Sequence, residues 1–239
     1  MIDNISSFSI ALAITAVIAY LLGSLNFAII ICRLWKKTDI RTVGSKNAGF
    51  TNTLRVFGKG PAILTMLGDL SKGVIAVIIG ITIFRLFNTG LVVPEHLRDV
   101  VTEEYSTVFV GYVAGIFAII GHIFPIYYGF KGGKGILVSC SILLVIDPIT
   151  FCIEIPFFIL IVIITRYVSV ASISAAVLYP ITTFVTQTLS GNYPYVWLNV
   201  TLLCVTSIIL IYMHKENIKR LRAGTENKFG KKKKPKEET

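Results

Sequence analysis

Long apolar stretches separated by short polar segments make up most of this 239-residue chain. The apolar stretches lie near residues 8–34, 61–87, 106–126, 135–146, 149–165, 168–190 and 196–213. All but 135–146 approach or exceed the ~20 residues that a helix needs to cross a bilayer. Because a helix satisfies its own backbone hydrogen bonds in hydrocarbon, the pattern predicts an all-α polytopic membrane bundle with about seven transmembrane helices. An alternative has five spans, with 135–165 as one broken re-entrant unit.

The polar segments between these stretches differ in charge. With seven crossings, alternate connections lie on the same side of the membrane, and every lysine and arginine except Lys72, Arg85 and Arg98 lies on that side. Basic residues collect on the cytoplasmic side of membrane proteins. The sequence therefore predicts an N-terminus outside and a C-terminus in the cytoplasm, and the five-span alternative has the same sidedness.

Composition agrees with a membrane protein and limits the chemistry. Charged residues make up 15% of the chain, against roughly 25% in soluble domains. We expect a single transmembrane domain over residues 1–213, a cytoplasmic juxtamembrane segment over 214–227 and a disordered basic tail over 228–239. The four cysteines lie in apolar sequence without a CxxC pair, and no His, Asp and Glu set has metal-ligand spacing. Metal or redox chemistry is therefore not expected.

Candidate chemistry begins in the first basic segment, "GSKNAGFTNTLRVFGKG", which starts at Gly44. It carries hydroxyl, amide and guanidinium donors on a backbone interrupted by glycines, which suits a phosphate-bearing ligand. A cytoplasmic loop without function would explain the positive charge but not the density of donors. Asp69 and Lys72 follow in "GDLSKG", where their spacing allows them to pair on one helix face, either within a site or as a structural ion pair.

A second cluster, "GHIFPIYYGFKGGKG", runs from Gly121 to Gly135. Glycines let the main chain approach a ligand and expose its N–H groups, and lysines add positive charge, so anionic oxygens are the expected guests. It is not a nucleotide-binding P-loop, because Lys134 is followed by Gly135 rather than by serine or threonine.

Two further clusters have simpler readings from the residues alone. In "RYVSVASIS", Ser169 and Ser172 stand at the start of a span, where serines most often cap or pack helices. The segment "HKENIKRLRAGTENKFG", from His214 to Gly230, reads as a basic juxtamembrane helix that binds anionic lipid.

Together these stretches resemble one known family, the bacterial acyl-phosphate-dependent glycerol-3-phosphate acyltransferases of the PlsY type. The resemblance rests on six motifs in the family's order, which cover nearly the whole chain. They are "YLLGSLNFAIIICRL", "DIRTVGSKNAGFTNTLRVFGKG", "GDLSKG", "GHIFPIYYGFKGGKG", "YVSVASI" and "HKENIKRLRAGTE". Asn26 stands where the family pattern has proline.

The resemblance implies an enzyme of the bacterial inner membrane with its active site toward the cytoplasm. It would move a fatty acyl group from acyl phosphate to the 1-hydroxyl of sn-glycerol 3-phosphate, giving lysophosphatidic acid and inorganic phosphate. The catalytic candidates are Ser45, Arg55, Lys131, Lys134, His214 and Asn217. The substrate-binding candidates are Gly44, Asn47, Gly49, Thr51, Asn52, Asp69, Lys72, His122, Gly132, Gly133, Gly135, Ser169 and Ser172.

An acyl phosphate already carries a good leaving group, so direct attack by the hydroxyl suffices and positioning dominates. The base that takes the hydroxyl proton could be His214, His122 or a substrate phosphate, and we favour the phosphate, with His214 as a binding residue. We expect no cofactor, no nucleic-acid partner and a monomer. The His-x4-Asp signature of acyl-CoA-dependent glycerolipid acyltransferases is missing.

Two other functions would use similar loops. A transporter of a phosphorylated metabolite would also need basic glycine loops, but it would more often show duplicated halves, which this chain lacks. A membrane anchor or scaffold predicts that Arg55 and Lys134 can be neutralised without loss of function.

Overall fold

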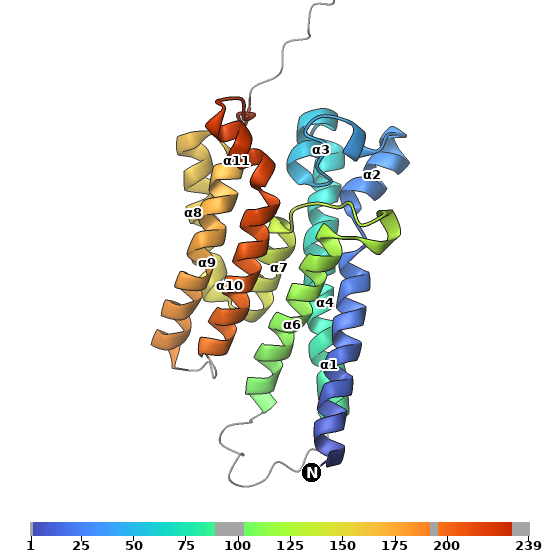
Figure 1. Cartoon of the computed structure of the whole chain (residues 1–239), viewed down its shortest axis with the longest axis vertical. Coiled ribbons are helices and arrows are strands. Elements are labelled where there is room, and N and C mark those ends of the chain that lie inside the picture. Colours follow the sequence, from blue (N-terminus) through green and yellow to red (C-terminus); the bar gives the residue numbers. More distant parts are fainter. Residues whose placement is uncertain (1, 89–102, 192–195, 231–239) are drawn as a thin grey trace, which may run out of the picture.

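The computed structural model describes residues 2–88, 103–191 and 196–230, and this part of the chain is a bundle of helices (Figure 1). The helices are α1 (Ile2–Gly23), α2 (Phe27–Lys36), α3 (Phe50–Phe57), α4 (Lys59–Asn88), α6 (Glu103–Ile123), α7 (Ile136–Ile146), α8 (Pro148–Thr165), α9 (Val168–Ser190), α10 (Val196–Met213) and α11 (Lys215–Arg222), with short 3-10 helices at Ile40–Thr42 and Ile126–Tyr128. The predicted all-α membrane bundle is confirmed.

The apolar stretches of the sequence correspond to these helices. Within the described ranges, 6 helical segments are long and apolar enough to cross a membrane, and Phe8–Lys36, which comprises most of α1 and all of α2, counts as one of them. The segment 135–165 consists of the 11-residue α7 and the 18-residue α8. Helix α7 therefore enters the bundle without the length of a span, as its short apolar stretch predicted.

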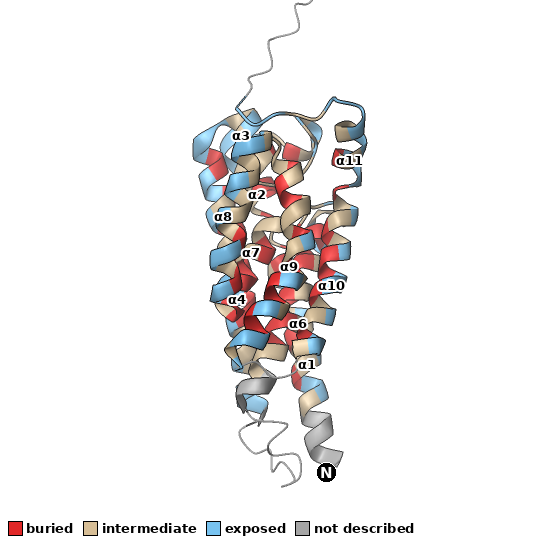
Figure 2. Cartoon of the chain, turned by 90° about the vertical axis from the view of Figure 1, so that its left-hand side faces the viewer, coloured by how far each residue is buried: buried red, intermediate tan, exposed pale blue. Residues whose placement is uncertain are grey.

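Small residues let the long helices approach one another closely. A side chain at Gly23 of α1 would collide with the main chain of Ala118 in α6, and one at Gly121 would collide with the carbonyl of Tyr20. Helix α8 differs from the others because it lies at the periphery, with little of its surface buried (Figure 2). Its buried residues are Thr150 and Glu154, both polar, while several of its isoleucines, such as Ile159 and Ile163, are exposed.

The first apolar stretch is broken between α1 and α2. Asn26 is fully buried and caps α2 by accepting a hydrogen bond from the Ile29 N–H at 3.1 Å. The main-chain carbonyls of Gly23 and Leu25, which the break leaves without helical partners, each accept from Lys72 Nζ at 2.8 Å. A break in a buried helix requires such partners, and here they are Asn26, which stands where the family pattern has proline, and the distant Lys72.

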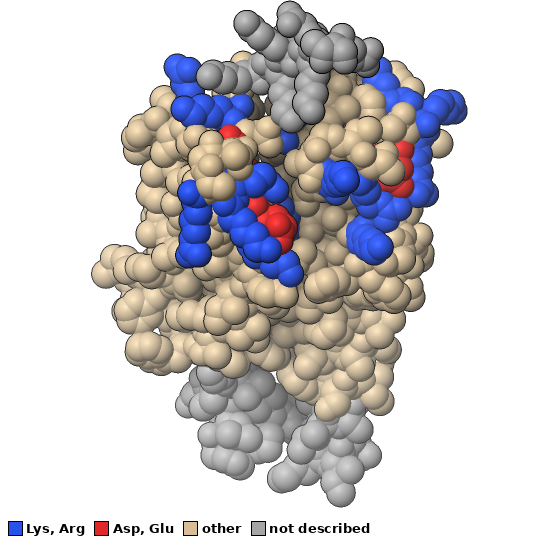
Figure 3. Space-filling view, turned by 45° about the horizontal axis from the view of Figure 1, so that its top comes forward, with Lys and Arg blue, Asp and Glu red and all other residues tan. Residues whose placement is uncertain are grey.

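Positive charge gathers at one end of the bundle. Figure 3 shows lysine and arginine side chains around the upper end, above a flank that carries none in this view. Helix α1 begins at the opposite end, and α11 lies at the basic end (Figure 1). This arrangement has the sidedness that the charge pattern predicted, and the assignment of the basic end to the cytoplasm stays a prediction. Arg98 and the tail residues 231–239 lie outside the described residues.

Candidate active site

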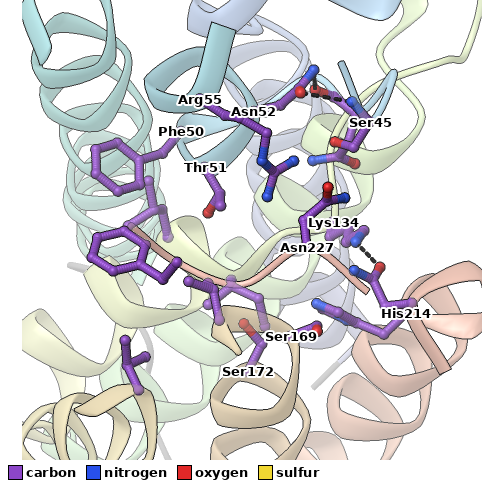
Figure 4. Close-up of a pocket in the computed structure, with 18 of the residues that line it drawn as sticks. Ser45, Phe50, Thr51, Asn52, Arg55, Lys134, Ser169, Ser172, His214 and Asn227 are labelled. Carbon is purple, nitrogen blue, oxygen red and sulfur yellow. Dashed lines mark hydrogen bonds between the residues drawn. The ribbon is translucent and has the colours of Figure 1, made fainter. Parts of the chain in front are cut away.

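The loop before α3 is organised by one buried amide. Asn52 is 1% exposed, and its Nδ2 donates to the carbonyls of Ile40, Val43 and Asn47 at 3.1–3.2 Å, while its Oδ1 accepts from the Ser45 N–H at 2.8 Å. These bonds curl the loop over the start of α3. As a result Ser45 and Arg55 face the same space as Thr51 (Figure 4).

The glycine loop folds back on the end of α6. The Gly132 N–H donates to the Ile123 carbonyl at 3.0 Å, and the Gly133 N–H donates to the His122 carbonyl at 3.1 Å. A Cβ at Gly133 would collide with the His122 ring and with the Ala48 carbonyl, so this close approach requires glycine. The turn aims Lys134 away from the surface and toward Asn217, whose Oδ1 accepts from Lys134 Nζ.

The segment after α10 completes the site through Glu226, whose side chain is 5% exposed. Its Oε1 accepts from Ser169 Oγ at 3.1 Å and from Asn217 Nδ2 at 2.8 Å, and its Oε2 accepts from Arg220 Nε at 2.6 Å. The chain then crosses back to the connection between α8 and α9, where the Phe229 N–H donates to the Arg166 carbonyl at 2.7 Å. Glu226 therefore joins the start of α9 to α11.

These segments surround a cavity of about 480 Å³ that has two different ends. At one end lie polar side chains of the loop before α3, Lys134 and the segment after α10, with Phe50 to one side of them (Figure 4). The apolar part of the lining comes from α3, α4, α7 and α8. The apolar lining residues include Phe50, Met66, Ile136, Leu137, Phe158, Ile159, Val162 and Ile163. Ile159 and Ile163 are also 50% and 67% exposed on the outer face of α8, so the cavity reaches the surface that faces lipid.

Burial and like charges perturb two groups at the polar end. Burial lowers the pKa of Lys134 to about 8, the positive charges of Arg220 and Arg55 act in the same direction, and Glu226 opposes them. Burial also lowers the pKa of His214 to about 4, helped by the charge of Lys134. His214 is therefore neutral near pH 7. Since a carbonyl can only accept, its Nδ1 carries the proton and donates to the Leu210 carbonyl at 2.8 Å, which leaves Nε2 as an acceptor.

A buried ion cluster lies where the bundle meets the cavity. Lys72 Nζ lies 3.1 Å from Asp69 Oδ1 and 2.9 Å from His122 Nδ1. Asp69 and His122 line the cavity, whereas Lys72 points to the break between α1 and α2. The cluster thus links the break between α1 and α2 to His122, the residue against which the glycine loop folds.

Comparison with known proteins identifies the group to which this architecture belongs. A family model described as glycerol-3-phosphate acyltransferase matches residues 13–224. The chain belongs to this family. The glycerol-3-phosphate acyltransferase of Coxiella burnetii (strain CbuG_Q212) is 39% identical over 218 residues, which cover 91% of this chain and 98% of that protein. The one from Halalkalibacterium halodurans is 40% identical over 215 residues, 90% of this chain and 94% of that protein.

A solved structure of the glycerol-3-phosphate acyltransferase family is also similar in fold. The crystal structure of PlsY (YgiH), an integral membrane glycerol 3-phosphate acyltransferase in its glycerol 3-phosphate form, matches with a TM-score of 0.73 at 32% identity. The match covers 92% of this chain and 96% of that one. The resemblance drawn from the six motifs is confirmed.

Most of the predicted site residues of this acyltransferase family member line the cavity. They are Ser45, Asn47, Gly49, Thr51, Asn52, Arg55, Asp69, His122, Lys134, Gly135, Ser169, Ser172, His214 and Asn217. The other predicted residues, Gly44, Lys72, Lys131, Gly132 and Gly133, are outside this lining. Lys131 is exposed, and its carbonyl accepts from Arg41 Nη1 at 3.1 Å on the surface. The catalytic and binding roles of all these residues stay predictions.

Three polar residues that line the cavity were not among the candidates: Arg220, Glu226 and Asn227. Arg220 and Glu226 lie within the motif "HKENIKRLRAGTE" that the acyltransferase family shares, so the motif itself was a signal. The default reading of this segment as a lipid-binding surface helix does not account for the inward-facing Asn217, which is buried.

Proposed function

We propose that the protein transfers a fatty acyl group from acyl phosphate to the 1-hydroxyl of sn-glycerol 3-phosphate, releasing lysophosphatidic acid and inorganic phosphate. The observation that carries the proposal is the two-ended cavity. Arg55, Lys134 and Arg220 line its polar end, and the apolar end reaches the lipid-facing side of α8. A reaction between two phosphate-bearing substrates, one with a long apolar chain, needs both features in one space.

The cations serve binding and charge stabilisation. Guanidinium groups suit bidentate contacts to phosphate, and an ammonium adds a mobile point charge. In the proposed reaction the glycerol hydroxyl attacks the acyl carbon, the bond from that carbon to the phosphate oxygen breaks, and its electron pair leaves with phosphate. Lys134 and Arg55 stabilise the charge that develops on the acyl oxygen and the departing phosphate.

The hydroxyl proton passes to a substrate phosphate in this mechanism. A phosphate monoester has a second pKa near ~6, closer to neutral pH than the pKa of about 4 for His214. Because an effective base has a pKa near the working pH, His214 is the weaker candidate. Its Nε2 lone pair, which the Nδ1 bond to Leu210 defines as an acceptor, is suited instead to orient the hydroxyl.

Glu226 and Asn217 keep the donors in place. Asn217 accepts from Lys134 and donates to Glu226, so its amide can take only one orientation. The carboxylate also holds Ser169 and Arg220. Preorganised donors of this kind act at no reorganisation cost during the reaction.

The test uses purified protein in detergent, where transport across a membrane cannot be scored. Radiolabelled glycerol 3-phosphate is supplied with palmitoyl phosphate or palmitoyl-CoA, and labelled lysophosphatidic acid is measured. Product is expected from palmitoyl phosphate alone, with a loss of about 10²–10³-fold in Lys134→Ala. Lys59→Ala, which removes an exposed lysine at the same end of the bundle, is the matched control. Absence of product from both donors contradicts the proposal, and uptake of label by liposomes would then indicate a transporter.

A further inference from the structure

A second cavity lies beside the first, deeper in the bundle. It has a volume of about 40 Å³ and is lined by residues of α7, α8, α9 and α10, and one water-sized probe needs only ~10–15 Å³. Ile136 and Phe158 line both cavities. The two spaces therefore meet at this pair of side chains, at the apolar end of the main cavity.

A buried acid stands at this second cavity. Glu154 lines it and is 5% exposed. Its Oε1 accepts from Thr182 Oγ1 at 3.0 Å, while its Oε2 has no hydrogen-bond partner among the described residues. A carboxyl group within a membrane span is costly and marks a functional position by default. Neither the six motifs nor the proposed mechanism uses Glu154.

We propose that the second cavity receives the far end of the acyl chain and that Glu154 closes it, which limits the length of the chain that the enzyme accepts. This inference rests on the proposed acyl-transfer function. Leu137, Ile136 and Phe158 line the main cavity together with Lys134, so hydrocarbon is favoured between the polar end and the second cavity. Hydrocarbon reaching past Glu154 would have to displace a carboxylate whose Oε1 is held by Thr182 and whose Oε2 already lacks a hydrogen-bond partner, which is unfavourable.

The structure offers the chain one competing route. Ile159 and Ile163 line the main cavity and are exposed on the outer face of α8. A chain leaving between them would enter lipid, where no protein wall limits its length. The two routes therefore predict different dependences of turnover on chain length.

The test measures kcat/KM with saturated acyl phosphates from dodecanoyl to eicosanoyl. Each methylene that gains or loses a buried site should change kcat/KM about fourfold. Glu154→Leu should raise the ratio of stearoyl to myristoyl phosphate, because the chain then meets an apolar side chain that the Thr182 hydrogen bond no longer holds in place. Glu154→Gln keeps a polar side chain at this position and should retain the wild-type ratio. It therefore shows whether the change in Glu154→Leu comes from lost polarity or from any substitution at residue 154.

A variant that fills the second cavity should favour shorter acyl chains instead. Ala176 lines the second cavity and is 3% exposed, so Ala176→Leu should lower the same ratio. Val177, its neighbour, is 51% exposed on the outside, so Val177→Leu adds bulk without filling the cavity and should leave the ratio unchanged. If Ala176→Leu fails to fold, as judged by gel filtration, the inference is tested by the ratio of stearoyl to myristoyl phosphate in Glu154→Leu and Glu154→Gln alone.

The outcomes are distinguishable. An active wild type whose chain-length ratio is the same in Glu154→Leu, Glu154→Gln and the folded filling variant overturns the inference and places the chain on the route to lipid. A wild type that is inactive with every acyl phosphate overturns the proposed function, and this inference with it.

Discussion

Two of the polar clusters inside this apolar bundle use their hydrogen bonds differently. In the candidate site, Lys134, Arg55 and His214 line a cavity and leave donors or acceptors directed toward it. In the second cluster, fully buried Asp147 accepts from the N–H and hydroxyl of Thr150 at 3.0 and 2.8 Å. Gln187 donates to the Tyr112 hydroxyl at 2.9 Å.

The second cluster joins the helices to one another and lies away from the cavities. Asn199 Nδ2 donates to Gln187 Oε1 at 3.1 Å, and the hydroxyls of Thr150 and Thr186 are 2.8 Å apart, so the network connects α6, α8, α9 and α10. Among the described residues that line either cavity, none belongs to it. A polar residue inside a membrane bundle therefore indicates a site only when its donors reach a space that a ligand can enter. Otherwise it serves as a bond between helices.

The sharpest test of the cavity cluster is a double-mutant cycle on Lys134 and Asn217. Each alanine variant should lower kcat/KM by about 10²–10³-fold if its group stabilises the transition state. Because Lys134 donates to Asn217, the double variant should lose far less than the product of the two single losses. Initial rates with palmitoyl phosphate measure all four proteins. Multiplicative losses would show that the two groups act independently.

Gly133→Ala tests the path of the loop rather than a functional group. The new Cβ would meet the His122 ring and the Ala48 carbonyl, so the loop must move and carry Lys134 with it. A displacement of about 1 Å can cost ~10²-fold in rate.

The control is Gly129→Asn in the same loop. Gly129 has a φ of 65°, with nothing within 4 Å of its Cβ position, and asparagine tolerates that conformation. Near-normal turnover of Gly133→Ala would mean that the loop path does not set the position of Lys134.

The sequence predicted the helices well because membrane spans depend on local hydropathy, and its six motifs identified the family. It did not predict the consequences of long-range contacts. Lys131 and Lys134 are equivalent in a glycine-rich loop, yet the fold directs Lys134 inward and leaves Lys131 exposed beside Arg41. That difference depends on His122 and Ala48, which lie against Gly133.

The position of Glu226 in the site and the break at Asn26 were not predicted for the same reason, because both depend on residues far away in the sequence. A carboxylate is unexpected in a site for anions, and its position depends on Ser169, 57 residues away. The break between α1 and α2 is tolerated because Lys72, 49 residues from Gly23, supplies donors to the free carbonyls. Local sequence patterns do not reveal the contact of Glu226 with Ser169 or that of Lys72 with Gly23.

The pH dependence of kcat/KM should show a smaller effect, a loss of activity as the pH rises. Lys134 has a pKa of about 8 and is assigned to act as a cation. It is charged below that pH, so activity should be full there and fall by about tenfold per pH unit above it. Substrate titration near pH ~6 affects the acid side of the profile instead.

Lys134→Arg tests whether Lys134 is the group whose deprotonation causes the fall in kcat/KM at alkaline pH. A guanidinium stays charged throughout this range, so the alkaline fall should move to higher pH even if the maximal rate drops. Lys59→Arg is the control and should leave the profile as in the wild type. An alkaline fall that is unchanged in Lys134→Arg would assign it to another group.

Asp147→Asn should have the smallest effect on catalysis, and it completes the comparison. Asparagine keeps an oxygen for the Thr150 N–H but replaces the second acceptor, which the Thr150 hydroxyl uses at 2.8 Å. Since single side-chain bonds between membrane helices are worth about 0.6 kcal/mol, a loss near ~1 kcal/mol should lower the Tm by about 2–4 °C. Turnover per folded molecule should not change, because the network is outside both cavities. Thermal unfolding in detergent and active-fraction kinetics measure the two quantities separately. A variant that melts normally but has lost turnover would mean that the distinction between the two clusters is wrong.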